Sequence, residues 1–347
     1  MKIAIIGFGF MGVMHAQIYQ SLPGVELAAV VDLNRDGATQ KLQSIGLVLP
    51  VYSTLREMLE KVEVQAVDIC SPTDQHVGLA IEATEAGKHL FIEKPLAFTP
   101  EDCALIQTAV QRAGVVAQVG HCIRFWPEYM ALKEYIEMGD LGRLKSLRLT
   151  RRSARPGGGE PTHWVNMERL SGGAAFDMHV HDTDFALSLF GTPQSVYSST
   201  TQGLSGPDHI FTHYEYPDVV VQAEGGWDYP QHYGFSMAFE AVFTDGVLSY
   251  HSNEAPSLTV TRTGQRTESV PVQQPTLTES STTIGNISAL GGYFNELAYF
   301  ADRVKANKAP RIATIAQASE TIRVLCAELE SARSGDPIPL QLHPHST

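Results

Sequence analysis

A group of histidines and carboxylates in the middle of the chain has the composition of a proton-transfer site. Asp177, His181 and Asp184 occupy positions i, i+4 and i+7 of an expected helix, so their side chains share one helix face. A carboxylate beside an imidazole orients the ring and raises its basicity, as general-base catalysis requires. The spacing therefore predicts that Asp177 and His181 work as a catalytic pair.

The second candidate for chemistry is Lys94, which follows the apolar run Phe91-Ile92 and precedes Pro95. Proline cannot continue a strand ladder, so the lysine stands at a strand end. In open α/β sheets the carboxyl ends of the strands form the edge that binds ligands. A cation there can offset negative charge on a substrate oxygen. The alternative is a surface lysine without a role.

A metal site in the histidine cluster is disfavoured by geometry. His179 and His181 are two residues apart, so on a regular helix their side chains diverge by about 200° and cannot reach the same ion. We therefore expect no metal here, and the sequence assigns no role to His179.

The elements that must position these groups begin with strands and helices in alternation. The expected strands are Ile3–Ile6, Leu27–Val31, Ala66–Ile69, His89–Ile92 and Val115–Val119. The expected helices between them are Met11–Ser21, Arg35–Ser44, Thr54–Leu59, Gln75–Ala86 and Pro100–Ala113. This alternation predicts an α/β fold, with a doubly wound parallel sheet in a Rossmann domain over residues 1–121.

The pattern changes after this domain. Residues 122–347 predict an α+β domain with a large, open, mixed or antiparallel sheet, because strand patterns follow one another from Ser195 to about Val272. The polar stretch Gln273–Thr283 is expected to be a loop. The expected helices are Pro127–Met138, one that begins near Ala174, Gly292–Ala306 and Ile315–Ser334. The final helices are candidates to pack back on the first domain.

The loop Gly7-Phe8-Gly9-Phe10-Met11-Gly12 matches the dinucleotide-binding pattern G-x-G-x-x-G. It directly follows an expected strand and opens an expected helix, which is the context that gives the pattern its meaning. Gly7 makes the tight turn, Gly9 admits a pyrophosphate close to the backbone, and Gly12 lets the helix pack on the strand. We therefore expect Phe10, Met11 and these glycines to contact the cofactor.

Asp32 ends the second expected strand, where a carboxylate binds the adenosine ribose and repels a 2′-phosphate. NAD is thus favoured, whereas Arg35 leaves NADP possible. At the end of the third strand, Ser71, Pro72 and Thr73 are expected to flank the dinucleotide. His76 either points into the same crevice or is a helix-surface histidine without a role.

Composition excludes several classes of protein. The chain has 347 residues and a net charge of −13, which repels nucleic acid and anionic membranes. No run of about 18 apolar residues is present, and the chain starts directly at the first strand, without the features of a secretory signal. The four cysteines form neither a zinc pattern nor a disulfide framework and suit a reducing cytoplasm: Cys70, Cys103, Cys122 and Cys326.

These motifs together resemble the Gfo/Idh/MocA family, the glucose-fructose oxidoreductase and inositol dehydrogenase group, over nearly the full chain. The resembling segments are G-F-G-F-M-G, S-P-T-D-Q-H, G-K-H-L-F-I-E-K-P-L, G-H-C-I-R-F and G-G-A-A-F-D-M-H-V-H-D-T-D. The resemblance implies that Lys94 is the catalytic lysine, that Asp177 and His181 are its D-x-x-x-H pair, and that Glu93 lies near the nicotinamide ribose. It also implies a cis Lys94-Pro95 bond and a homodimer or homotetramer formed through the C-terminal sheet.

The expected activity is hydride transfer between NAD(P) and a secondary alcohol or ketone of a sugar, an inositol-like cyclitol or a related polyol. Two alternatives stay open, namely an NAD-dependent, redox-neutral glycoside hydrolase and a non-enzymatic NAD(P)-binding sensor. The expected substrate contacts come from polar and aromatic side chains, which suit a polyol: His121, Arg124, His163 and Trp164.

Overall fold

The computed structural model describes residues 1–156, 166–204, 206–275 and 291–341. Its contacts divide the chain into two compact units. The first unit comprises Met1–Cys122 and Pro275–Ser319, and the second comprises Ile123–Gln274 and Glu320–Thr347. The chain therefore leaves the first unit, builds most of the second, and returns.

The first unit contains a six-stranded sheet in which every pair of neighbouring strands is parallel. Its order, β3-β2-β1-β4-β5-β6, is that of a dinucleotide-binding Rossmann sheet. The strands are β1 (Lys2–Ile6), β2 (Glu26–Val31), β3 (Val51–Tyr52), β4 (Ala66–Ile69), β5 (His89–Glu93) and β6 (Ala117–Gly120). The predicted doubly wound parallel sheet is confirmed, with β3 as a strand that the sequence pattern did not predict.

Helices connect these strands and begin where the sequence provides capping residues. In α5 (Pro100–Ala113), the Thr99 hydroxyl accepts a hydrogen bond from the Asp102 N–H at 3.1 Å, and Pro100 occupies the first turn. The helix ends at Gly114, whose φ of +64° favours glycine. The other connecting helices are α1 (Phe10–Ser21), α2 (Arg35–Ser44), α3 (Leu55–Lys61), η1 (Thr73–Gln75) and α4 (His76–Glu85).

Helix α9 (Gly291–Lys305) belongs to the first unit although it comes late in the chain. It contacts α1, and its Phe300 packs edge-on against Phe91 of β5 with ring centroids 5.5 Å apart. Both rings are fully buried in the core of this unit. A segment far along the sequence thus completes the core of the N-terminal sheet.

The second unit is built on a nine-stranded mixed sheet with the order β14-β13-β12-β11-β7-β10-β9-β8-β15. The β7–β10 pair is parallel and the remaining pairs are antiparallel, which confirms the predicted large mixed sheet. The strands are β7 (Leu144–Ala154), β8 (Ser195–Gly203), β9 (Gly206–Glu215), β10 (Val220–Tyr229), β11 (Ser236–Phe243), β12 (Gly246–His251), β13 (Leu258–Arg262), β14 (Glu268–Ser269) and β15 (Ile338–Pro339).

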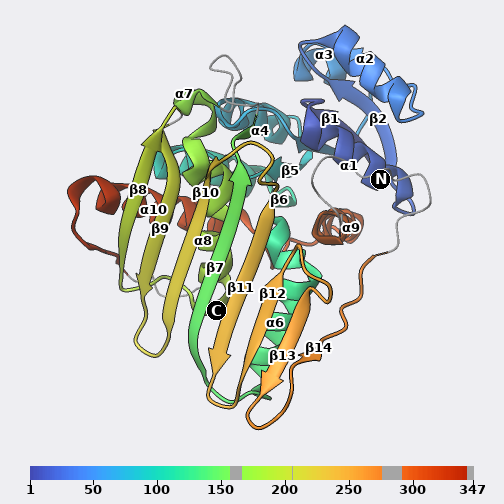
Figure 1. Ribbon diagram of the computed structural model, residues 1–347. Helices are drawn as coiled ribbons and strands as arrows, with labels where there is room; N and C mark the ends of the chain where they lie inside the picture. The colour runs from blue at the N-terminus through green and yellow to red at the C-terminus, as the bar shows by residue number, and fades with distance from the viewer. Residues whose placement is uncertain (157–165, 205, 276–290, 342–347) are drawn as a thin grey trace. The chain divides into compact units, whose positions relative to one another are not determined.

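Helices line one face of this sheet, as Figure 1 shows for α6, α8 and α10. The helical elements of the second unit are η2 (Cys122–Phe125), α6 (Pro127–Met138), α7 (Glu168–Ser171), η5 (Ala175–His179), α8 (Val180–Phe190) and most of α10 (Ile315–Ser334). Within the described residues, no helix combines the length and apolarity needed to span a membrane.

Candidate active site

The glycine loop between β1 and α1 has the close packing that the motif predicts. Gly7 has a φ of +86°, and a Cβ added to it would lie 2.7 Å from the Ser71 backbone nitrogen. A Cβ on Gly12 would overlap the Gly7 carbonyl oxygen. A Cβ on Gly9, in contrast, would meet no atom within 4 Å. The fold itself thus requires Gly7 and Gly12, whereas Gly9 leaves open space next to exposed backbone, as the approach of a phosphate requires.

Asp32 follows β2 and is held by two backbone donors. Its carboxylate oxygens accept hydrogen bonds from the N–H groups of Phe8 and Asn34, each at 2.7 Å. A hollow of about 410 Å³ opens beside it and is lined mainly by residues that directly follow it: Leu33, Asn34, Arg35, Asp36, Thr39 and Val51. Of the other predicted cofactor contacts in the loop, Phe10 is 50% exposed and Met11 is half-buried.

His76 is not a surface residue, so the alternative of a helix-surface histidine is wrong. It is 1% exposed, and its ring lies between two loops at the carboxyl edge of the sheet. The Nε2 atom is 3.0 Å from the Ser71 carbonyl oxygen, and Nδ1 is 3.0 Å from that of Pro95. Burial is the main cause of the lowered pKa of His76. This ring therefore ties the segment after β4, with Ser71, Pro72 and the buried Thr73, to the segment after β5.

Lys94 stands at the end of β5, as the sequence predicts. The preceding residue, Glu93, is 5% exposed, and its carboxylate accepts a hydrogen bond from the Lys94 backbone N–H at 3.0 Å. Lys94 itself is half-buried, and the Lys94-Pro95 peptide bond is cis, as the family resemblance implies.

The helix that carries Asp177 and His181 does not start as a regular α-helix, so the expected spacing on one continuous face is wrong. Residues Ala175–His179 form a π-helical turn, η5, in which the Val180 N–H bonds to the Ala175 carbonyl. Regular α-helix begins only at Val180. The π-turn therefore changes the angle between Asp177, which is half-buried, and His181, which is 7% exposed.

Asp184, which was expected on the same helix face as Asp177 and His181, is bound by an arginine. Its carboxylate binds Arg124 through two hydrogen bonds of 2.7 Å, and it also accepts one from the Thr321 hydroxyl at 3.0 Å. This forked ion pair is almost completely buried within the second unit. The neighbouring Asp182 is bound in the same way by Arg151.

His179, to which the sequence assigns no role, lies in a buried network of the second unit. Its Nε2 atom is 2.8 Å from a carboxylate oxygen of Glu328 in α10. The Thr212 hydroxyl of β9 donates to the same oxygen at 3.0 Å, and the Thr183 hydroxyl donates to the other at 3.1 Å. The network joins η5, α8, β9 and α10, so His179 holds the π-turn in place.

The remaining predicted substrate contacts have different positions. His121 is 1% exposed. His163 and Trp164 lie outside the described residues.

The first unit also contains polar residues that the sequence pattern did not single out. His15, Asp68 and Glu296 are fully buried beside Glu93. The apolar periodicity of their elements gave no sign of them, because a polar residue within an amphipathic pattern is usually exposed. A histidine one turn into the helix after the glycine loop was the available signal.

Dinucleotide-binding geometry thus belongs to the first unit, together with Lys94, whereas Asp177 and His181 belong to the second unit. The sheet order and the glycine loop define the class of the first unit as a Rossmann dinucleotide-binding domain.

Comparison with known proteins gives the family. The model described as "Oxidoreductase family, NAD-binding Rossmann fold" matches residues 1–121, and the GFO/IDH/MocA C-terminal domain matches residues 129–249. The chain is 30% identical over 285 residues to Inositol 2-dehydrogenase 2 of Saccharopolyspora erythraea, a match that covers 78% of each protein. It is 28% identical over 353 residues to scyllo-inositol 2-dehydrogenase (NAD(+)) of Bacillus subtilis, covering 98% of this chain and 96% of the relative.

A solved structure shares the fold. Levoglucosan dehydrogenase in complex with NADH and levoglucosan has a TM-score of 0.83 at 23% identity, covering 98% of this chain and 99% of the other. The chain belongs to the GFO/IDH/MocA family of oxidoreductases, and its N-terminal domain is an NAD-binding Rossmann domain. The resemblance and the enzyme class predicted from the sequence are therefore confirmed.

Proposed function

We propose that this chain is an NAD(P)-dependent dehydrogenase that oxidises a secondary alcohol of a cyclitol, sugar or related polyol, or reduces the corresponding ketone. The observation that carries the proposal is the similarity to a scyllo-inositol 2-dehydrogenase (NAD(+)) over 98% of the chain. The chain has Lys94 at the strand end together with Asp177 and His181, which can supply the cation and the general base that this chemistry needs.

Three side chains share the work in the proposed mechanism. His181 accepts the proton of the substrate hydroxyl group as a general base. Lys94 donates a hydrogen bond to a substrate oxygen and offsets the negative charge that develops there. Asp177 orients the imidazole or a neighbouring substrate hydroxyl. The nicotinamide supplies the hydride acceptor when the cofactor is bound.

The residues present fit an NAD cofactor. Open backbone at Gly9 suits a pyrophosphate, and Phe10, Met11, Ser71, Pro72 and Thr73 surround the same edge of the sheet. Asp32 keeps two backbone hydrogen bonds and remains available to a ribose diol. We propose NAD as the preferred cofactor because this carboxylate repels a 2′-phosphate, with NADP use left to Arg35 in the adjacent hollow.

We also propose that the chain forms a homodimer or homotetramer through the outer face of its nine-stranded sheet and that it works in the cytoplasm. Large apolar side chains are exposed on strands of this sheet: Tyr197, Phe211 and Val220. Exposed apolar groups of this size favour burial by a partner. The cysteines are unbridged, which suits a reducing compartment.

The test is a nicotinamide-absorbance screen of the purified protein with NAD and, separately, NADP against inositols, aldoses, sugar acids and their amino derivatives. Turnover of one substrate class supports the proposal. His181→Ala then lowers kcat by about 100-fold or more while NAD affinity stays unchanged, whereas the exposed His213→Ala control keeps wild-type activity.

Other outcomes point to other functions. Release of a sugar without net NADH, with exchange of a substrate C–H for solvent hydrogen, identifies a redox-neutral hydrolase. Cofactor binding that changes only the oligomeric state identifies a sensor. A comparable loss of NAD binding in His181→Ala assigns a structural role to this residue.

A further inference from the structure

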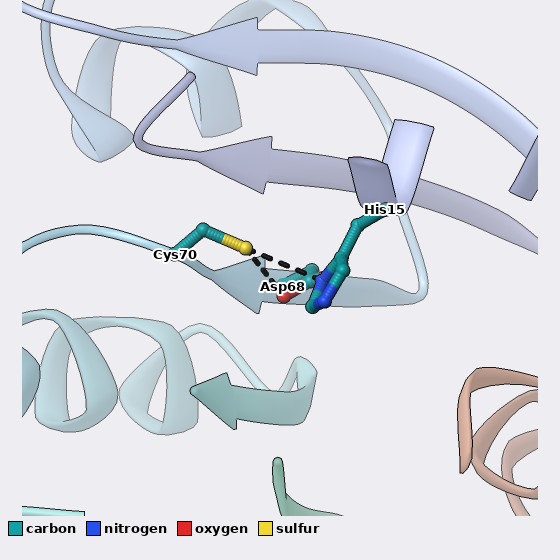
Figure 2. Close-up of side chains that lie close together, drawn as sticks. All are labelled: His15, Asp68 and Cys70. Carbon is teal, nitrogen blue, oxygen red and sulfur yellow. Dashed lines mark hydrogen bonds and ion pairs between the residues drawn. The ribbon is translucent and has the colours of Figure 1, made fainter. Parts of the chain in front are cut away.

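A buried polar cluster in the first unit lies directly behind the strand end that carries Lys94. Figure 2 shows three of its members, His15 of α1, Asp68 of β4 and Cys70 after β4. Asp68 is 2.8 Å from the Nδ1 atom of His15, and the Cys70 thiol lies 3.2 Å from the other oxygen of Asp68. Both His15 and Asp68 are 0% exposed. Asp68 therefore orients the imidazole inside the buried core.

The other side of the His15 ring faces Glu93. Its Nε2 atom lies 3.2 Å from Glu93 Oε1, while Glu93 Oε2 accepts the Lys94 backbone N–H at 3.0 Å. Gly120 leaves room for this carboxylate, since a Cβ at that position would lie 2.9 Å from Glu93 Oε1. The Glu93 carboxylate is thus held between α1 and the backbone of Lys94.

Glu296 of α9 adds a further carboxyl group, and it is 0% exposed. One side-chain nitrogen of His15 and one carboxyl oxygen each of Glu93 and Glu296 lie within 4.8 Å of one another. Among the described residues, neither oxygen of Glu296 has a hydrogen-bond partner. A buried carboxylate without a partner is strongly unfavourable, so it either keeps its proton or binds a cation.

The charges favour the proton. Burial by itself lowers the pKa of His15, but the nearby Cys70 and Asp68 more than offset this and raise it well above its usual value. Burial, followed by the negative charge of Glu93, raises the pKa of Glu296 well above its usual value. The remaining facing groups, Tyr19, Cys70 and Tyr293, also have pKa values that are raised mainly by burial. A charged imidazole has no lone pair to give a metal.

We propose that Glu296 retains a proton at neutral pH and shares it with Glu93, and that Glu296 and His15 are positioning residues that hold the backbone at Lys94. The second half of this inference rests on the proposed function. The neutral Glu296 hydroxyl donates to Glu93, and the charged His15 faces Glu93 from the opposite element. The carboxylate of Glu93 then stays fixed against the Lys94 N–H, and the lysine leaves the strand in one direction.

The protonation state is tested by infrared difference spectroscopy at neutral pH, which needs no substrate. Wild type minus Glu296→Gln is expected to show the C=O band of a protonated carboxylic acid. The control Asp302→Asn removes an exposed acid from the same helix and is expected to show only carboxylate bands. A carboxylate band for Glu296, or a stoichiometric metal ion in the purified protein that Glu296→Gln loses, would overturn the proposal.

The positioning role is tested with two substitutions of Glu296 in an active enzyme. The glutamine variant still donates an N–H to Glu93 and is expected to keep kcat within about threefold of wild type. The leucine variant has no donor and is expected to lose about tenfold or more in kcat, with a shifted pH profile of kcat and an unchanged affinity for NAD. Cofactor-binding stoichiometry identifies folded protein in each case.

The two proposals fail in different ways. If no polyol is oxidised, the proposed function fails while the infrared experiment still decides the protonation of Glu296. If wild type is active and the leucine variant matches it in kcat and pH profile, the proposed function stands and the positioning role is wrong.

Discussion

Each of the two units buries a histidine against carboxylates, but the carboxylates differ in how many hydrogen-bond partners they have. In the second unit, the two oxygens of Glu328 accept hydrogen bonds from the hydroxyl groups of Thr183 and Thr212, and one of them also contacts the ring of His179. In the first unit, both oxygens of the equally buried Glu296 lack such partners within the described structure. The first arrangement stabilises a fold, whereas the second keeps an unfavourable group beside the strand end that carries Lys94.

This difference separates packing from function in a way that burial alone does not. A satisfied buried network fixes one conformation of the core, and its loss is felt mainly as lost stability. An under-satisfied network is retained at some cost in stability, which natural proteins tolerate mainly near functional sites. The comparison therefore predicts that substitutions in the Glu328 network of the second unit change stability most, and that substitutions in the Glu296 cluster of the first unit change activity as well.

The largest expected effect comes from breaking the network around Glu328. Glu328→Ala is expected to lower the free energy of unfolding by about 3 to 5 kcal/mol, because His179 and two hydroxyls lose their buried partner together. Urea denaturation measures this loss. The matched control is Glu330→Ala, which removes an exposed glutamate from the same helix. If the two variants lose the same small amount, Glu328 is not a structural anchor.

Much of the fold was predictable because its signals are local. Helices such as Arg35–Ser44 and Pro100–Ala113 match their predicted bounds because capping residues stand at their ends. The two-residue strand β3 was missed because Val51–Tyr52 is too short to show a period. The π-turn at Ala175–His179 was missed because its stabilising contact, His179 with Glu328, joins distant parts of the chain.

The candidate site divides along the same line. The glycine loop, Asp32 and Lys94 were found because each stands at a recognisable strand end. The cluster around Glu93 was not found, because His15 and Glu296 come from helices at opposite ends of the sequence and meet only in the folded unit. Hydrophobic patterns report which residues are buried, but they do not report which buried charges meet.

The next effect sharpens the comparison through pH. The pKa of His15 in the folded protein lies above its usual value of 6.5, so the charged ring contributes stability fully below pH 6.5 and loses it as pH rises through the folded pKa. Asp68→Asn removes the charge that holds this ring and is expected to lower the free energy of unfolding by about 1.5 to 3 kcal/mol near pH 6.

Urea denaturation at a series of pH values upward from about 6 measures this effect, with the exposed Asp302→Asn as control. The gap in unfolding free energy between wild type and Asp68→Asn is expected to narrow as pH rises through the folded pKa of His15, because the wild-type ring then loses its proton. A gap that widens as pH rises contradicts a charged His15.

A smaller effect comes from moving Glu93 without changing any charge. In Gly120→Ala the new methyl group would lie 2.9 Å from Glu93 Oε1, so the carboxylate must shift. We expect a loss of about 1 to 3 kcal/mol in the free energy of unfolding, together with reduced kcat in an active enzyme. Gly78→Ala is the control, since a methyl group there meets nothing within 4 Å. Equal behaviour of the two variants would show that the position of Glu93 is unimportant.

The smallest expected effect concerns a third histidine–carboxylate cluster, which is partly exposed on the sheet. Glu224 binds Arg152 at 2.6 and 2.7 Å and lies 3.2 Å from His209. Burial raises the pKa of Glu224, but hydrogen bonds from His209 and Arg152 outweigh it and lower the pKa to about 2. Its stabilising contribution is therefore present above pH 4.5 and lost as pH falls towards 2.

Solvent screens this third cluster, so Glu224→Gln is expected to lower the free energy of unfolding by only about 0.2 to 1 kcal/mol at neutral pH, and by less at high salt. His209 contributes to stability with the opposite pH dependence. Burial lowers its pKa, but Glu224 and Asp228 raise it above 6.5, so the stabilisation by the charged ring is lost as pH rises. Urea denaturation at several pH values and salt concentrations measures how the free energy of unfolding depends on each. If Glu224→Gln lowers the free energy of unfolding as much as Glu328→Ala does, solvent exposure does not weaken the contribution of this cluster to stability. The number of hydrogen bonds to the carboxylate would then determine the contribution of each cluster.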